Sequence, residues 1–100
     1  EEFAILCNGV ETRVHLASAA LRIVEAVRDA AIPHGSGSLE VTVSAGGALP
    51  GTDDMGWGDC LRRADDHLYA AKSAGRDRGI VHTGPNESLT CLAAAPSAST

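Results

Sequence analysis

Two pairs of charged residues in this sequence have types and spacings that could support chemistry. Glu1 and Glu2 are adjacent carboxylates in front of a short apolar run, and Lys72 and Arg76 lie four residues apart around the end of a predicted helix. Cations there could meet an anion, although the helix dipole favours them in any case, by up to about 1 kcal/mol. Adjacent carboxylates could hold a cation or simply solvate the end of a strand. From these residues alone, both interpretations of each pair stay open.

The helix that carries the two cations is the most strongly patterned stretch of the chain. Its apolar residues recur at helical spacing and form one stripe, made of Leu61, Ala64, Leu68 and Ala71. Gly75 follows this stripe, and a glycine there commonly takes the left-handed conformation that ends a helix. Lys72 and Arg76 are therefore predicted to flank the helix terminus.

Three blocks of the sequence resemble GGDEF domains, the diguanylate cyclases, and they come in the family's order. The run ADDHLYAAKSAGRDR resembles the last helix of the family, in which a RAD..LY.AK..GRN pattern is typical. The stretch Glu1–Leu6 resembles the end of the GG[DE]EF signature with the strand that follows it, and Val41–Gly46 resembles the VT.S.G strand. The resemblance covers about residues 1 to 82 and begins inside the signature, after its two glycines.

The resemblance implies an enzyme of bacterial signalling that joins two GTP molecules into cyclic di-GMP and releases pyrophosphate. In the family, the third residue of the signature binds a divalent cation and the fourth is also needed for activity. These positions are Glu1, which would bind Mg²⁺ or Mn²⁺, and Glu2, which would act at the metal or at the attacking hydroxyl; carboxylates are the ligands that Mg²⁺ prefers. Lys72 and Arg76 match the AK..GR residues that hold the terminal phosphates of GTP, where a point charge and a planar fork complement each other.

The resemblance also implies a fold and partners. The expected fold class is α/β of the α+β type, a ferredoxin-like nucleotidyl-cyclase palm with helices flanking a mostly antiparallel sheet, of which this chain would form the C-terminal β-α-β-α-β part. Catalysis in the family takes a homodimer of domains, each holding one GTP, and we expect an attached sensory domain in the parent protein. Because a second metal carboxylate and the guanine-binding groups lie upstream in the family, we expect this fragment to be inactive alone.

A different class of function is an alternative to catalysis. The chain could be part of a degenerate GGDEF domain that binds GTP, or only a partner protein, and regulates an attached module. The sequence preceding the signature would discriminate between these hypotheses, because intact glycines and a metal-binding aspartate favour catalysis.

Around these blocks, the composition predicts the remaining elements of the first half. Helical periodicity indicates a packing helix from about Glu11 to Ala31, with Arg22 and His15 at its surface. Pro33–Ser38 has the composition of a loop, and Leu39–Ala45 that of a strand. The small residues at the end of this strand predict a looser sheet edge there. The apolar run Phe3–Cys7 is typical of a short buried strand.

The second half contains a loop, a short strand and a polar tail. In the loop Leu49–Gly58 we expect Asp53 and Asp54 to face water and Trp57 to pack the loop onto the next helix, with Gly58 or Asp59 as its cap. The segment Arg78–His82 is predicted to form a last strand. His82 has no histidine or cysteine at ligand spacing, so we predict no metal role for it. Residues 83–100 have the composition of a disordered tail or linker. The predicted domain therefore spans residues 1–82.

Composition excludes some classes of partner. The net charge of −5 leaves no basic field for a nucleic-acid backbone, so no nucleic-acid partner is expected. The three cysteines are irregularly spaced without a CxxC pair, which favours reduced thiols in the cytoplasm over a disulfide framework. Since no apolar run is long enough to span a bilayer, any membrane anchor of the parent protein is expected outside this chain.

Overall fold

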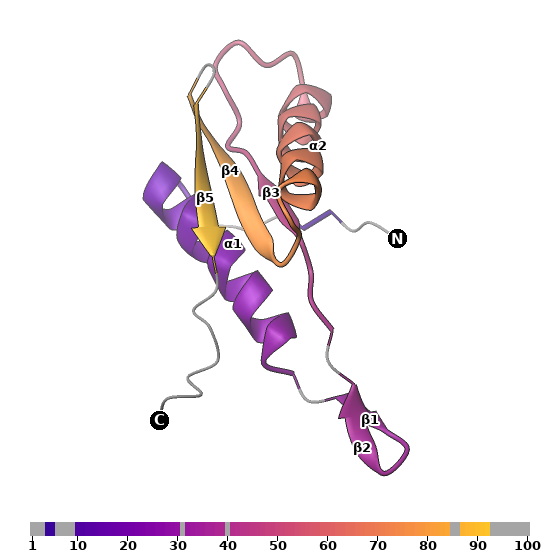
Figure 1. The fold of residues 1–100 in the computed structure, drawn as a ribbon. Coiled ribbons are helices and arrows are strands. Elements are labelled where there is room, and N and C mark those ends of the chain that lie inside the picture. Colours follow the sequence, from indigo (N-terminus) through magenta and orange to yellow (C-terminus); the bar gives the residue numbers. More distant parts are fainter. Residues whose placement is uncertain (1–3, 6–9, 31, 40, 85–86, 93–100) are drawn as a thin grey trace.

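The computed structural model describes residues 4–5, 10–30, 32–39, 41–84 and 87–92, which form two helices and five strands. In chain order the elements are α1 (Arg13–Arg28), β1 (Ile32–His34), β2 (Gly37–Leu39), β3 (Ala45–Gly47), α2 (Trp57–Ser73), β4 (Arg78–Gly84) and β5 (Glu87–Leu92). Three strands form a mixed sheet in the order β3-β4-β5, in which β3 is parallel to β4 and β5 is antiparallel to it. The predicted α+β class, with helices against a sheet, is confirmed (Figure 1).

The two helices cover opposite faces of this sheet. Successive residues of a strand point to opposite faces, and in β3 a Cβ on Gly46 would run into the backbone of α2 at Ala64 and Leu68, whereas a Cβ on Gly47 would meet Leu16 of α1, 3.3 Å away. The central strand β4 is therefore covered on both sides, which explains why its residues Ile80 and Val81 are both buried. Figure 1 shows α1 and α2 on either side of the three strands.

The small residues of β3 have the opposite effect to the one expected from the sequence. We expected Ala45 and Gly47 to loosen the sheet edge, but Gly46 between them lets α2 approach the sheet backbone more closely than any side chain would allow, and a Cβ on Gly47 would already lie 2.9 Å from Cγ1 of Val81. The backbone of α2 fills the space that a side chain at Gly46 would occupy, so the packing here is closer rather than looser. This contact fixes where α2, and with it Lys72, lies on the sheet.

The core between these layers is small. Its buried apolar residues come from both helices and from strands β4 and β5: Ala20, Val24, Cys60, Ala71, Ile80, Val81 and Cys91. Among the described cysteines, Cys60 and Cys91 are both free thiols. None of the helices in the described part of the chain is long and apolar enough to cross a bilayer.

Helix α1 matches the packing helix predicted at Glu11–Ala31. Thr12 caps its N-terminus, where the side-chain oxygen accepts a hydrogen bond from the backbone N–H of His15 at 3.1 Å. Arg22 and His15 are exposed, as predicted. Val24 of this helix is completely buried and Ala20 is nearly so, and both are apolar residues at helical spacing.

The segment between α1 and β3 differs from the prediction. The predicted loop Pro33–Ser38 forms most of a hairpin, in which β1 and β2 pair through Ile32 and Leu39, and Gly35 takes a φ of 62° at the turn. Of the predicted strand Leu39–Ala45, only Ala45 belongs to β3. A strand forms where a partner offers hydrogen bonds rather than where β-favouring residues gather, and the partner β4 pairs with residues 45–47.

The two ends of the chain also differ from expectation where the structure describes them. Part of the predicted tail, Glu87–Leu92, forms β5 and pairs with β4 along its length, with Cys91 opposite Gly79. Its backbone hydrogen bonds and the burial of Cys91 stabilise a segment whose composition alone predicted disorder. Residues 93–100 lie outside the described part. Of the strand predicted at Phe3–Cys7, only Ala4 and Ile5 are described, and both are exposed and outside any strand.

The start of α2 also corrects the sequence prediction. Trp57 is the first residue of the helix and is 64% exposed, so it does not anchor the preceding loop. The N-cap position is Gly56, which offers no side-chain hydrogen bond. Asp59, in the first turn, stabilises the start of the helix instead, because its Oδ2 accepts a hydrogen bond from the backbone N–H of Met55 at 2.8 Å.

Candidate phosphate-binding turn at the end of helix α2

Helix α2 ends at Ser73, and Gly75 follows it with a positive φ, as the sequence predicts. Ala74 is the C-cap, and its N–H donates to the carbonyl of Ala70 at 2.9 Å. Gly75 follows with a φ of 129°, and the N–H of Arg76 then reaches back to the carbonyl of Ala71 at 3.0 Å. These bonds satisfy helix carbonyls that would otherwise lack a partner.

The turn continues in the left-handed region beyond the glycine. Arg76 has a φ of 64° and Asp77 a φ of 51°, and they are the non-glycine residues with positive φ in the described part of the chain. Such a conformation costs about 1–2 kcal/mol for each residue that carries a Cβ. Strain of this kind persists where the surroundings impose it, and it is concentrated at binding and catalytic sites.

Two arginines from other elements hold this strained pair. The Nε–H of Arg78, the first residue of β4, donates to the carbonyl of Arg76 at 2.9 Å. The carboxylate of Asp77 lies 3.6 Å from Nε of Arg28, in the last turn of α1. The backbone of Arg76 is therefore bonded to α2 and β4, and α1 contacts the side chain of the next residue, Asp77, while the side chain of Arg76 is exposed.

The two predicted phosphate ligands flank this turn. Lys72 is half-buried in the last turn of α2, and Arg76 is exposed just after the helix. Both lie at the negative end of the helix dipole, which favours a cation there. One ammonium and one guanidinium are thus placed four residues apart at this end of α2.

The predicted metal ligands Glu1 and Glu2 lie outside the described residues. Their proximity to Lys72 and Arg76 stays a prediction. Within the described ranges, no three His, Cys, Asp or Glu side chains are grouped so as to hold a metal ion.

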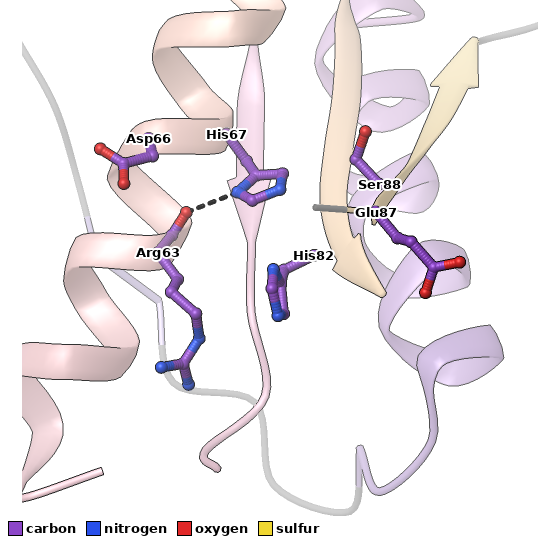
Figure 2. A pocket seen from close by; sticks show the side chains of 6 residues that line it. All are labelled: Arg63, Asp66, His67, His82, Glu87 and Ser88. Atoms are coloured by element: carbon purple, nitrogen blue, oxygen red, sulfur yellow. Dashed lines mark hydrogen bonds between the residues drawn. The ribbon is translucent and has the colours of Figure 1, made fainter. Parts of the chain in front are cut away.

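A second place where polar side chains converge is a cavity of about 310 Å³ between α2 and the β4–β5 hairpin. Figure 2 shows its lining, made of Arg63, Asp66, His67, His82, Glu87 and Ser88.

The histidines of this cavity are in contact, which their separation in the sequence did not indicate. The rings of His67 and His82 lie 5.4 Å apart between centroids, at 85° to one another. His67 Nδ1 lies 2.7 Å from the carbonyl of Arg63, and because a carbonyl only accepts, Nδ1 carries the hydrogen. Burial lowers the pKa of His82, and the neighbouring His67 lowers it further. The position of each ring is explained by its contact with the other ring, and that of His67 also by its hydrogen bond to Arg63.

The carboxylate of Asp54 does not face water, which corrects the expectation for the loop. Arg63 binds it with two hydrogen bonds, of 2.6 and 2.7 Å, and also donates to the carbonyl of Leu49 at 2.8 Å. The N–H of Gly51 adds a further bond to Asp54, at 2.6 Å. The hydrogen bonds from Arg63 and then Gly51 lower the pKa of Asp54 from 3.8 to about 2. This bidentate pair fastens the loop to α2, while Asp53 is exposed.

The family profile described as "Diguanylate cyclase, GGDEF domain" matches residues 1–78. The chain belongs to the GGDEF family. No curated protein matches the chain.

The part of the chain that matches the GGDEF family includes the turn after α2 but only half of the residues that line the cavity. The matched range contains all four predicted site residues, Glu1, Glu2, Lys72 and Arg76, and the strained turn that follows α2. It ends before His82, Glu87 and Ser88, which line half of the cavity in Figure 2. The turn at the end of α2 is therefore the candidate functional site of this GGDEF domain.

Proposed function

We propose that this chain is part of a diguanylate cyclase, which condenses two GTP molecules to cyclic di-GMP and pyrophosphate. The observation that carries the proposal is the match to the GGDEF family, whose range includes the turn where Lys72 and Arg76 flank the end of α2. The strained backbone of Arg76 supports a binding role, because the structure maintains an unfavourable conformation at the residue that the motif assigns to phosphate.

In this proposal each residue has a separate task. Lys72 and Arg76 bind the terminal phosphates of GTP and hold the leaving pyrophosphate, while a 3′-hydroxyl from the opposing domain attacks the α-phosphate. Little covalent chemistry is asked of the protein, since phosphoryl transfer depends on positioning and on charge neutralisation. A homodimer is required because each domain holds only one of the two nucleotides.

The metal in this proposal is Mg²⁺ or Mn²⁺, held by Glu1 and Glu2. Adjacent carboxylates fit Mg²⁺, which takes oxygen ligands and is commonly bound by one or two carboxylates together with substrate phosphates. When bound, the ion neutralises charge that develops on the phosphates. Glu2 is placed either at the ion or at the attacking hydroxyl.

Binding of GTP with Mg²⁺ to the full-length protein is the first test. A ligand at a hundred times its Kd stabilises a protein by about 2.7 kcal/mol, so GTP should raise the melting temperature. Lys72→Ala or Arg76→Ala should each weaken GTP binding about tenfold or more, since hydrogen bonds to charged groups contribute about 1.5–3 kcal/mol. Arg62→Ala is the matched control, because this α2 arginine is 73% exposed and pairs with Asp59 instead.

The outcomes separate the possible functions. Cyclic di-GMP formed from GTP would establish the cyclase, whereas GTP binding without product would favour the degenerate, regulatory GGDEF domain. Unchanged GTP affinity in both Lys72→Ala and Arg76→Ala would show that the phosphates bind elsewhere. A full-length protein that neither binds GTP nor forms cyclic di-GMP would contradict the proposal altogether.

A further inference from the structure

We propose that Arg78 is a positioning residue for GTP, which acts on the phosphates through the backbone of Arg76 rather than by touching them. This inference rests on the proposed function of the turn, and it concerns a residue at which neither the motif nor the charge pattern assigned a role. Arg78 is the first residue of β4 and is half-buried.

The side chain of Arg78 contacts the residues of the turn. Its Nε–H donates to the carbonyl of Arg76 at 2.9 Å. Its Nη2 lies close to Gly75, since a Cβ built on this glycine would be only 2.8 Å away. The guanidinium of Arg78 therefore lies against Gly75 and bonds the next peptide, so that it holds both residues that carry the chain out of α2.

This contact matters because the conformation of Arg76 is not one that the residue prefers. Arg76 has a φ of 64°, and its carbonyl accepts the hydrogen bond from Arg78 in this conformation. The N–H of the same residue is held by Ala71, at 3.0 Å. Both backbone polar groups of Arg76 are thus committed, one to α2 and the other to β4.

A second restraint acts on the next residue from the other side of the sheet. Asp77, with a φ of 51°, lies 3.6 Å from Nε of Arg28 in α1. The turn is therefore held between elements that pack on opposite faces of the sheet. Because a guanidinium binds phosphate through a fork of fixed geometry, a change in the backbone of Arg76 would turn this fork away from the anion.

Two roles for Arg78 make different predictions, and a double-mutant cycle separates them. If Arg78 acts through Arg76, then Arg78→Ala should weaken GTP affinity about as much as Arg76→Ala, roughly tenfold. In the Arg76→Ala background, Arg78→Ala should then cause no further loss, because residues that act as one unit are not additive. If Arg78 contacts the phosphates itself, the two losses should multiply.

The experiment measures the affinity of the full-length protein for GTP with Mg²⁺ by calorimetry, for the wild type, both single variants and the double variant. Arg62→Ala serves as the charge-matched control and should keep wild-type affinity. Arg28→Ala removes the ion pair with Asp77 from the α1 side without altering a residue of β4, so it should also reduce affinity, and it keeps the test valid if Arg78→Ala does not fold.

Nuclear magnetic resonance gives a readout that does not depend on nucleotide. The coupling between the amide and α protons of Arg76 reports its φ, which should leave the left-handed region in Arg78→Ala and stay there in Arg62→Ala. A multiplied loss in the double variant, or wild-type affinity in Arg78→Ala with Arg76→Ala impaired, would overturn the positioning role and leave the proposed function standing. If the wild type did not bind GTP, the proposed function would fail first, and the positioning role with it.

Discussion

Replacing Gly46 by alanine tests the contact that places α2 on the sheet. A Cβ at this position would overlap the carbonyl oxygen of Ala64 and the N–H of Leu68, and it would lie 2.8 Å from the Cα of Leu68. Carbon atoms in contact are normally about 3.5–4.0 Å apart. Because all three neighbours are backbone atoms, no side chain can rotate away, and α2 must move outward by about 1 Å or more.

The expected loss of stability follows from this displacement. Over-packing of a filled interior costs about 1–3 kcal/mol and occasionally more, and we place Gly46→Ala near ~3 kcal/mol because the obstacle is helix backbone. For a domain of this size, each kcal/mol lowers the melting temperature by about 4–8 °C. The predicted decrease is therefore ~12–24 °C, measured by circular dichroism together with the urea midpoint.

Two other glycines serve as internal standards. At Gly47 the new Cβ would be 2.9 Å from Cγ1 of Val81 and 3.3 Å from Cδ1 of Leu16, both of them side-chain atoms that can shift, so Gly47→Ala should cost about 1 kcal/mol. Gly58 has open space around it within α2, and Gly58→Ala should stabilise the protein by up to about 1 kcal/mol. If Gly46→Ala melted at the wild-type temperature, or less far below it than Gly47→Ala, α2 would not be seated on β3 as described.

Two further predictions concern the loop and the last strand. The folded protein lowers the pKa of Asp54 from 3.8 to about 2, so its contribution to stability should be complete above 3.8 and be lost as the pH falls towards 2. Asp54→Asn should therefore flatten the dependence of the urea midpoint on pH in this range; an equal flattening in Asp53→Asn, whose side chain is exposed, would refute the ion-pair explanation. Burial raises the pKa of the Cys91 thiol, so iodoacetamide at pH 8 should alkylate Cys91 slowly in the native protein and rapidly in urea. Peptide mass spectrometry can compare it with the thiol introduced by Ser88→Cys on the exposed part of the same strand, and equal rates would mean that β5 is not docked.

Local sequence signals determined the helices and the turn that ends α2. The apolar stripe and Gly75 predicted α2 and its terminus because helix formation depends on residues three and four positions apart and on a single left-handed position. The same stretch carries the motif that places Lys72 and Arg76, so the candidate phosphate ligands were identified before the fold was known. The predictions of α2 and of its end succeeded because the interactions that enforce them are local, whereas the phosphate-binding role of Lys72 and Arg76 stays a prediction.

Where a segment depends on a distant partner, sequence reasoning gave a different answer from the structure. Glu87–Leu92 has the composition of a tail, and only the presence of β4 beside it makes a strand. The β-favouring residues Val41–Val43 remain outside the sheet, while the small residues of β3 form part of it because β4 pairs with them, and Gly46 among them allows close approach of α2. Strand formation is decided by hydrogen bonds between segments far apart in the chain, which local propensity does not report.

The sequence by itself determined the family, the two helices and the identity of the cations that flank the end of α2, because motifs and helical periodicity are local properties. Only the tertiary structure decided that Arg76 and Asp77 occupy strained left-handed conformations, and that Arg78 of β4 bonds Arg76 while Arg28 of α1 contacts Asp77. It alone also joined Asp54 to Arg63 and His67 to His82. Each of these contacts depends on how helices and strands pack together, and packing brings together side chains whose spacing in the sequence carries no signal of contact.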